Sequence, residues 1–291
     1  MVNKLKGPLY LSIAASIWGG MYVASKYALN TIPPFTLLFI RYFLASIILL
    51  GLCKWKRITI IHREDKWLLF QIGFFGYFLS IATQFMGTKL SSAHMGAVIT
   101  SLSPIFQSIF AIVILKDKIT LKQAAAIGIS LVGMLLITNV TGTHSGLLNT
   151  GSLFFLAAAC LWGYYSVLAK KAAGRHSELQ ITTWGILWAT LFALPAAFTE
   201  FHSWDFRIIF HSLPVLGSIL YIAIFATTIA FFSWNKGLAV TNSHRAGLFL
   251  FFQPVVGSLL GWLILGETLT AAFFVGGLLI LTGAYIAIRV V

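Results

Sequence analysis

Ten apolar runs, separated by short polar connections, occupy almost the whole chain. Their approximate limits are residues 8–29, 35–53, 67–87, 94–115, 121–138, 151–171, 180–199, 213–235, 244–265 and 269–289. A helix needs about 20 predominantly apolar residues to cross the hydrocarbon core of a bilayer. Helices also satisfy their backbone hydrogen bonds internally, which lipid cannot do for them. The chain is therefore predicted to be an all-α membrane protein with ten transmembrane helices.

The composition agrees with lipid, and not water, as the main solvent. Of the 291 residues, 59% are hydrophobic and only 9% are charged, whereas a soluble domain carries about 25% charged residues. The net charge of +13 would suit a nucleic acid, but the basic residues stand at the ends of apolar runs and form no patch. The expected partner is a lipid bilayer, and no nucleic acid is expected.

Known catalytic patterns are missing from the sequence. It contains no phosphate-binding glycine loop, no HExxH motif and no cluster of carboxylates, and Cys53 and Cys160 lack metal-ligand spacing. No enzymatic activity, cofactor or metal is expected.

The distribution of Lys and Arg predicts the orientation of the chain in the membrane. With the N-terminus in the cytoplasm, sixteen basic residues fall on the inner side. Four fall on the outer side: Lys26, Arg41, Lys89 and Arg207. Cytoplasmic loops are enriched in Lys and Arg, so the split predicts ten spans with both termini in the cytoplasm. A bacterial plasma membrane is the expected location.

The chain also contains an internal repeat. Residues 93–120 align without gaps with residues 243–270, at an offset of 150, and Pro104 falls on Pro254. Near the start of each half, Trp18-Gly19 matches Trp162-Gly163 at an offset of 144. The two predicted five-helix repeats are residues 1–143 and 144–291.

An odd number of spans in each half forces the second half to run upside down relative to the first. The loop charges agree, because residues 54–66 carry five basic residues whereas the equivalent loop at 200–211 carries one basic and two acidic residues. Inverted repeats are common in secondary transporters, with the substrate site near the middle of the membrane between the halves. Two inverted five-helix repeats around a central cavity are therefore expected.

Several motifs resemble those of a known family. They are Trp-Gly in the first and sixth runs, Ser-Pro-Ile-Phe at 103–106, Gln-Pro-Val-Val at 253–256 and Leu-Gly-Glu-Thr-Leu at 265–269. Together they resemble the EamA family of the drug/metabolite transporter superfamily over essentially the whole chain. The resemblance implies a ten-helix fold with a cavity lined mainly by spans one, three, four, six, eight and nine. It also implies export or exchange of amino acids or related metabolites. In one departure, Lys116-Asp117 stands where the family usually has Gly-Glu.

Aromatic and amide side chains within the apolar runs are the candidate substrate-binding groups, because sites for organic solutes are mostly apolar with a few fixed polar groups. The alternative is that they pack helices together or hydrogen-bond between them. The candidates are Trp18, Tyr22, Tyr77, Gln84, Gln107, Trp162, Tyr165, Trp234 and Gln253.

Two prolines and two basic residues are further candidates. Pro104 and Pro254 each remove a backbone hydrogen bond within a span, which predicts paired kinks that either gate the cavity or only shape the packing. Lys26 and Arg41 are possible contacts for an anionic group of the substrate. For both, extension of the side chain to the membrane surface is the favoured interpretation.

No carboxylate is predicted at membrane depth, because Asp and Glu occur only at 64, 65, 117, 178, 200, 205 and 267, in loops or at helix ends. This pattern disfavours purely cationic substrates and proton coupling through an embedded acid. The expected function is a secondary transporter of a small-molecule substrate that works by alternating access as a monomer or weak homodimer. Alternatives are a multidrug or other-solute carrier of the same fold, a membrane enzyme and a non-transporting scaffold.

Overall fold

The protein is described from a computed structural model that places residues 2–58, 65–90, 96, 99–100, 102–137, 150–200, 207, 209, 212–265 and 271–289. Within these ranges the chain is helical and has no strand. The first half contains α1 (Val2–Leu29), α2 (Pro34–Trp55), α3 (Lys66–Gln71), the π-helix η1 (Ile72–Leu79), α4 (Ser80–Leu90), α6 (Ser103–Phe110), the π-helix η2 (Ala111–Leu115) and α7 (Leu121–Ile137).

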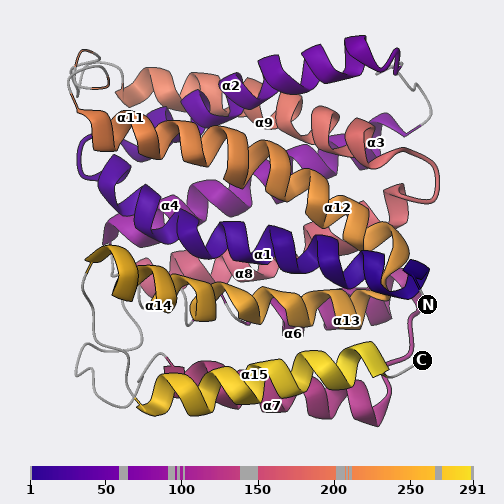
Figure 1. Ribbon diagram of the computed structural model, residues 1–291. Helices are drawn as coiled ribbons and strands as arrows, with labels where there is room; N and C mark the ends of the chain where they lie inside the picture. Colours follow the sequence, from indigo (N-terminus) through magenta and orange to yellow (C-terminus); the bar gives the residue numbers. More distant parts are fainter. Residues whose placement is uncertain are drawn as a thin grey trace.

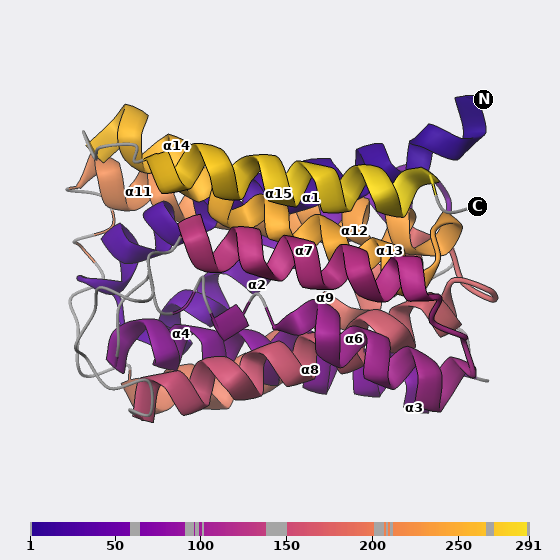
Figure 2. The same cartoon turned by 90° about the horizontal axis from the view of Figure 1, so that it is seen from below.

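The second half continues the chain with α8 (Thr150–Ala172), α9 (Glu178–Glu200), α11 (Leu213–Leu220), the π-helix η5 (Tyr221–Ile229), α12 (Ala230–Val240), α13 (Ser243–Leu248), the 3₁₀ turn η6 (Phe249–Phe251), α14 (Phe252–Leu265) and α15 (Ala271–Arg289). In both views the helices run roughly side by side, and the start of α1 and the end of α15 lie at the same end of the bundle (Figures 1 and 2).

Among the described residues, five helical segments are long and apolar enough to cross a membrane: Pro34–Trp55, Lys66–Leu90, Thr150–Ala172, Glu178–Glu200 and Leu213–Val240. Shorter apolar helices cover Ser103–Leu115, Leu121–Leu136 and Ala271–Ile286. Large apolar side chains such as Ile47, Val113, Leu191 and Leu278 are exposed on the outside of the bundle. A surface of this kind suits contact with lipid, so the prediction of an integral, all-α membrane protein is confirmed.

The helices α7 and α15 pack along one side of the bundle (Figures 1 and 2). A methyl group added at Gly133 would lie 2.5 Å from the carbonyl oxygen of Gly276, and one added at Gly283 would lie 2.8 Å from that of Ala126. Gly133 and Gly283 are equivalent in the repeat, and so are Ala126 and Gly276. The two helices therefore make the same close contact twice, once from each side.

The glycines that follow the paired tryptophans repeat this pattern. A methyl group at Gly19 would lie 2.9 Å from Cβ of Val256, and one at Gly163 would lie 2.8 Å from Cβ of Phe106. Phe106 and Val256 are equivalent at the offset of 150. The packing of α1 against α14 thus matches the packing of α8 against α6, and in each case only glycine leaves room for the approach.

A local change of helix geometry precedes each of the two prolines. Pro104 lies in the first turn of α6 after a turn at Leu102, and Pro254 lies in the first turn of α14 after the 3₁₀ turn η6. Proline is well accommodated in the first turn of a helix because its missing N–H has no partner there in any case. The paired kinks stay a prediction.

The structure also contains a pair of π-helical stretches that the sequence did not predict. The π-helices η1 and η5 occupy nearly equivalent positions in the two halves. In η1, Gly73 and Gly76 give room to the side chains of Trp188 and Tyr165. π-helical turns are rare and often lie at functional sites.

The close contact between α7 and α15 yields a prediction. Replacing Gly133 with alanine should force the two helices apart and destabilise the protein by about 1–3 kcal/mol, seen as a lower melting temperature of the detergent-solubilised protein. Gly128, in the same helix, is the matched control, because a methyl group there meets no atom within 4 Å. A Gly133→Ala protein that melts at or above the temperature of Gly128→Ala would contradict this packing.

Candidate functional site

A cavity lies within the bundle, toward the end at which α1 finishes and α2 begins. About 520 Å³ of space, including the open solvent at its mouth, is free of protein atoms. Its lining mixes aromatic, aliphatic and polar side chains from both halves: Trp18, Met21, Tyr22, Arg41, Ser80, Ile81, Gln84, Thr100, Ser103, Ala158, Trp162, Leu250 and Gln253.

Five of the nine candidate substrate-binding residues line this cavity, namely Trp18, Tyr22, Gln84, Trp162 and Gln253. Trp18 is held in place because its Nε1 donates a hydrogen bond to the carbonyl oxygen of Ala226 at 2.9 Å. Tyr22 shares a hydrogen bond of 2.9 Å with the hydroxyl of Thr100. The indole rings of Trp18 and Trp162, which are equivalent in the repeat, meet edge to face at 4.9 Å.

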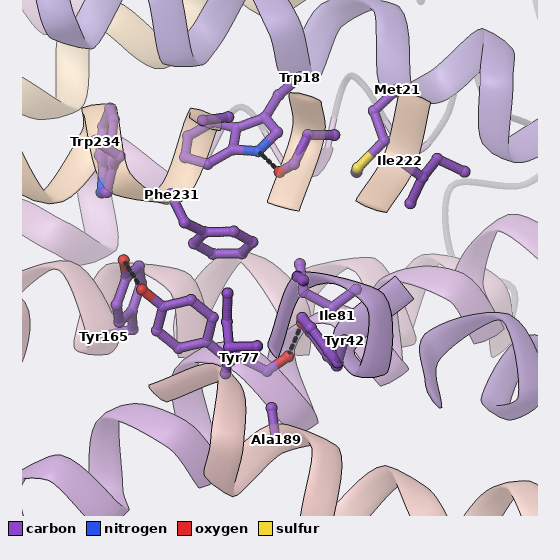
Figure 3. Packing of buried hydrophobic residues seen from close by; sticks show 14 of the residues in the cluster. Trp18, Met21, Tyr42, Tyr77, Ile81, Tyr165, Ala189, Ile222, Phe231 and Trp234 are labelled. Atoms are coloured by element: carbon purple, nitrogen blue, oxygen red, sulfur yellow. Dashed lines mark hydrogen bonds between the residues drawn. The ribbon is translucent and has the colours of Figure 1, made fainter. Parts of the chain in front are cut away.

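The other four candidates, Tyr77, Gln107, Tyr165 and Trp234, are fully buried outside the cavity lining. Three of them join an aromatic cluster with Trp18 and Phe231. Figure 3 shows Phe231 between Trp18 and Tyr77, with ring centroids 5.5 Å and 4.3 Å away. The cluster lies beyond the cavity, toward the end of the bundle at which α1 starts. Tyr77, Tyr165 and Phe231 of the cluster are fully buried.

A buried amide organises the polar groups of this cluster. Asn235 donates hydrogen bonds from Nδ2 to the hydroxyls of Tyr77 and Thr182, both at 2.9 Å. It accepts one from the hydroxyl of Tyr165 at 2.8 Å. The hydroxyls of Tyr77 and Tyr165 are themselves 3.1 Å apart. This network joins η1, α8, α9 and α12 beneath the cavity.

Gln107 connects two helices away from the cavity. Its Nε2 donates a hydrogen bond of 2.8 Å to the carbonyl oxygen of Ser243, at the first residue of α13. A hydrogen bond between helices is the role that the sequence analysis gave as the alternative to substrate binding.

Arg41 is the most unexpected member of the site. Its side chain does not extend to the membrane surface, as the sequence favoured, but is completely buried and forms part of the cavity wall. The Nε atom donates a hydrogen bond of 2.8 Å to Thr227 in η5, which anchors the guanidinium within the bundle. The side chain of Lys26, the other candidate anion contact, lies outside the described part of the structure.

The set of spans that line the cavity also differs from the expectation. The resemblance implied that span eight lines the cavity, but no lining residue in the described ranges comes from residues 213–240. The second helix contributes instead, through Arg41. The π-helix η5 of span eight instead holds two lining residues in place. The carbonyl oxygen of Ala226 accepts a hydrogen bond from Trp18, and the hydroxyl of Thr227 accepts one from Arg41.

Several site residues were missed by the sequence analysis. Met21 and Ile81 look like ordinary apolar residues of a membrane helix, and nothing in the pattern distinguishes them. Asn235 could have been found, because an amide in the middle of an apolar run must find partners inside the protein. Asn235 directly follows Trp234, and only Trp234 was among the candidate residues.

The lining of the cavity consists of groups that can bind a solute. Within the described residues, no group of three or more His, Cys, Asp or Glu side chains could hold a metal ion. The lining offers aromatic faces, two carboxamides, hydroxyls and one guanidinium, all of them binding groups. The fold and the site therefore define a membrane protein with a partly polar cavity between helices of two repeats.

The sequence places this protein in a particular family of that class. The EamA-like transporter family matches residues 5–139 and, separately, residues 149–289. The chain belongs to this family and carries its pattern twice, which confirms both the predicted family and the repeat.

Individual relatives agree. The chain is 28% identical, over 99% of its own length and 88% of the relative, to the "Uncharacterized transporter YetK" of Bacillus subtilis. It is 25% identical to a "Probable amino-acid metabolite efflux pump" of Salmonella typhimurium, over 93% and 90% of the two chains. One crystal structure, 19% identical, has a TM-score of 0.79 over 97% of this chain and 96% of that chain, which shows a shared fold.

The network below the cavity yields a prediction. Replacing Asn235 with leucine leaves the buried hydroxyls of Tyr77 and Tyr165 short of partners, which should destabilise the protein by about 1–3 kcal/mol. A lower melting temperature in detergent would reveal this. Gln84→Leu is the control, because Gln84 lines the cavity outside the network, and it should melt like the wild type. If Asn235→Leu also melts like the wild type, the network does not stabilise the bundle.

Proposed function

We propose that this protein is a secondary transporter that carries small organic metabolites, amino acids or compounds like them, across the membrane by alternating access. The observation that carries the proposal is the asymmetry of the bundle. A partly polar cavity occupies one side of the Trp18–Trp162 contact, and a packed aromatic cluster occupies the other. A carrier needs both, because one side must be sealed while the other is open.

The proposed architecture is ten spans in two inverted halves, residues 1–143 and 144–291. In Figure 1, α3 lies at the right and α4 at the left, whereas the equivalent α11 and α12 lie in the reverse order. Such an arrangement, together with the reciprocal glycine contacts, supports an internal twofold axis in the plane of the membrane. Rotation about this axis would exchange the open side for the closed side.

The basic loops support a cytoplasmic location for both termini, in a bacterial plasma membrane. With that orientation, the aromatic cluster lies on the inner side and the cavity faces outward. The changes of helix geometry beside Pro104 and Pro254, and the π-helices η1 and η5, are the places where the halves would bend as the cavity changes sides.

The choice of solute follows from the lining and from one relative. No Asp or Glu side chain is among the described lining residues, which disfavours purely cationic solutes. Aromatic walls and two carboxamides suit an organic solute with polar substituents. The printed name of the Salmonella relative, an amino-acid metabolite efflux pump, supports amino acids and their derivatives.

A transport assay tests the proposal. Purified protein in liposomes should exchange a labelled amino acid or related metabolite saturably, and Trp162→Ala should reduce this exchange about tenfold, because an aromatic wall of the site is lost. Trp262→Ala is the matched control, since Trp262 is an exposed tryptophan of α14, and it should transport normally.

Three results would contradict the proposal. Flux that rises without saturation would indicate an open pore instead of a carrier. Saturable transport that is unaffected by Trp162→Ala would place the solute elsewhere in the protein. A protein with no transport of any solute in the panel would favour a non-transporting scaffold.

A further inference from the structure

We propose that Arg41 binds the carboxylate of the transported solute, so that the cavity selects organic molecules that carry a carboxylate group. This inference rests on the proposed transport function and narrows the substrate class of the same site.

The guanidinium of Arg41 is only partly satisfied by the protein. Its Nε donates to Thr227 at 2.8 Å, and its Nη1 approaches the sulfur of Met21 at 3.6 Å. Its Nη2 has no hydrogen-bond partner among the described residues. A guanidinium carries five N–H donors, so most of its hydrogen-bonding capacity is unused.

The charge of Arg41 is not balanced either. A guanidinium stays protonated at any physiological pH, and burying a charge is costly unless it is paired. No carboxylate forms an ion pair with Arg41 among the described residues. Glu200, the last residue of α9, accepts hydrogen bonds from the backbone N–H and the hydroxyl of Thr36.

Aromatic rings compensate for part of this cost. The guanidinium carbon lies 5.3 Å from the ring centroid of Tyr42 and 5.6 Å from that of Phe85, distances at which cation–π attraction acts. These rings can stabilise the cation but accept none of its free N–H groups. An anion with two oxygen atoms would satisfy both the charge and the donors.

The side chain of Met21 stands where such an anion would bind. A thioether is a weak acceptor on a flexible side chain, and Met21 lines the cavity together with Arg41. If Met21 moves aside, Nη1 and Nη2 can both donate to one carboxylate, the bidentate geometry that makes arginine–carboxylate pairs strong. The body of the solute would then lie against Trp18, Trp162 and Ile81.

The alternative is that Arg41 only braces α2 against α1 and η5 through Met21 and Thr227. A brace would be needed for folding but would not distinguish between solutes. A carboxylate site, by contrast, must distinguish a carboxylate from a neutral group of the same size and shape.

The first test uses the wild-type full chain in detergent and needs no variant. Binding of acetate, butyrate and 3-phenylpropionate is compared with binding of their primary amides, which are nearly isosteric but uncharged. At least one of the carboxylates should bind about tenfold or more tightly than its amide. If no carboxylate binds more tightly than its amide, the inference is overturned.

The second test uses variants and measures the ratio of carboxylate to amide affinity. Arg41→Gln should bring the two affinities to within about twofold of each other while the amide still binds, and Arg41→Lys should keep part of the preference. Arg175→Gln is the matched control, because Arg175 pairs with Asp65 away from the cavity, and it should keep the wild-type ratio. An unchanged ratio in Arg41→Gln would overturn the inference, and if this variant does not fold, the wild-type series decides alone.

Transport measurements distinguish failure of this inference from failure of the proposed function. Saturable transport of uncharged solutes, without a preference for carboxylates, would overturn the role of Arg41 but leave the carrier function intact. Absence of saturable transport of every solute would overturn the proposed function itself.

Discussion

Close approach of helix backbones at glycine is the interaction on which the rest of this structure depends. Lipid offers no hydrophobic driving force for helix association, so helices are held by van der Waals packing and internal hydrogen bonds. The chain meets this demand with glycines that recur in both halves. Gly87 receives the ring of Phe155, and its equivalent Gly237 receives Leu11, which is the residue equivalent to Phe155 in the repeat. One packing solution, used twice, builds both sides of the bundle.

This double use explains where the cavity lies and how the aromatic cluster beside it is formed. The first and sixth spans bring Trp18 and Trp162 together, and the aromatic cluster fills the space on one side of that contact. In the cluster, the hydroxyls of Tyr77 and Tyr165 bond to Asn235, whereas Nε1 of Trp234 has no partner among the described residues. In the cavity wall, Nη2 of Arg41 is likewise without a partner among these residues.

Much of this could be predicted from the sequence, because lipid imposes simple rules on length, charge and repeats. The family, the repeat and the membrane-embedded helical fold followed from apolar runs and matched motifs. The depth of individual side chains did not, since Tyr77 and Gln84 occupy one polar stripe but only Gln84 reaches the cavity. Arg41 was misplaced because extension to the surface is the cheaper general solution. The π-helices leave no periodic signal in the sequence.

The central claim is that the two halves face opposite ways across the bilayer, and labelling of equivalent loops tests it directly. Single cysteines at Lys118 and Thr268, in a protein whose Cys53 and Cys160 have been replaced, would be treated in intact cells with a membrane-impermeant maleimide. The account predicts that the cysteine at 268 is labelled from outside and the one at 118 only after the cells are opened. Labelling of both positions from the same side would contradict it.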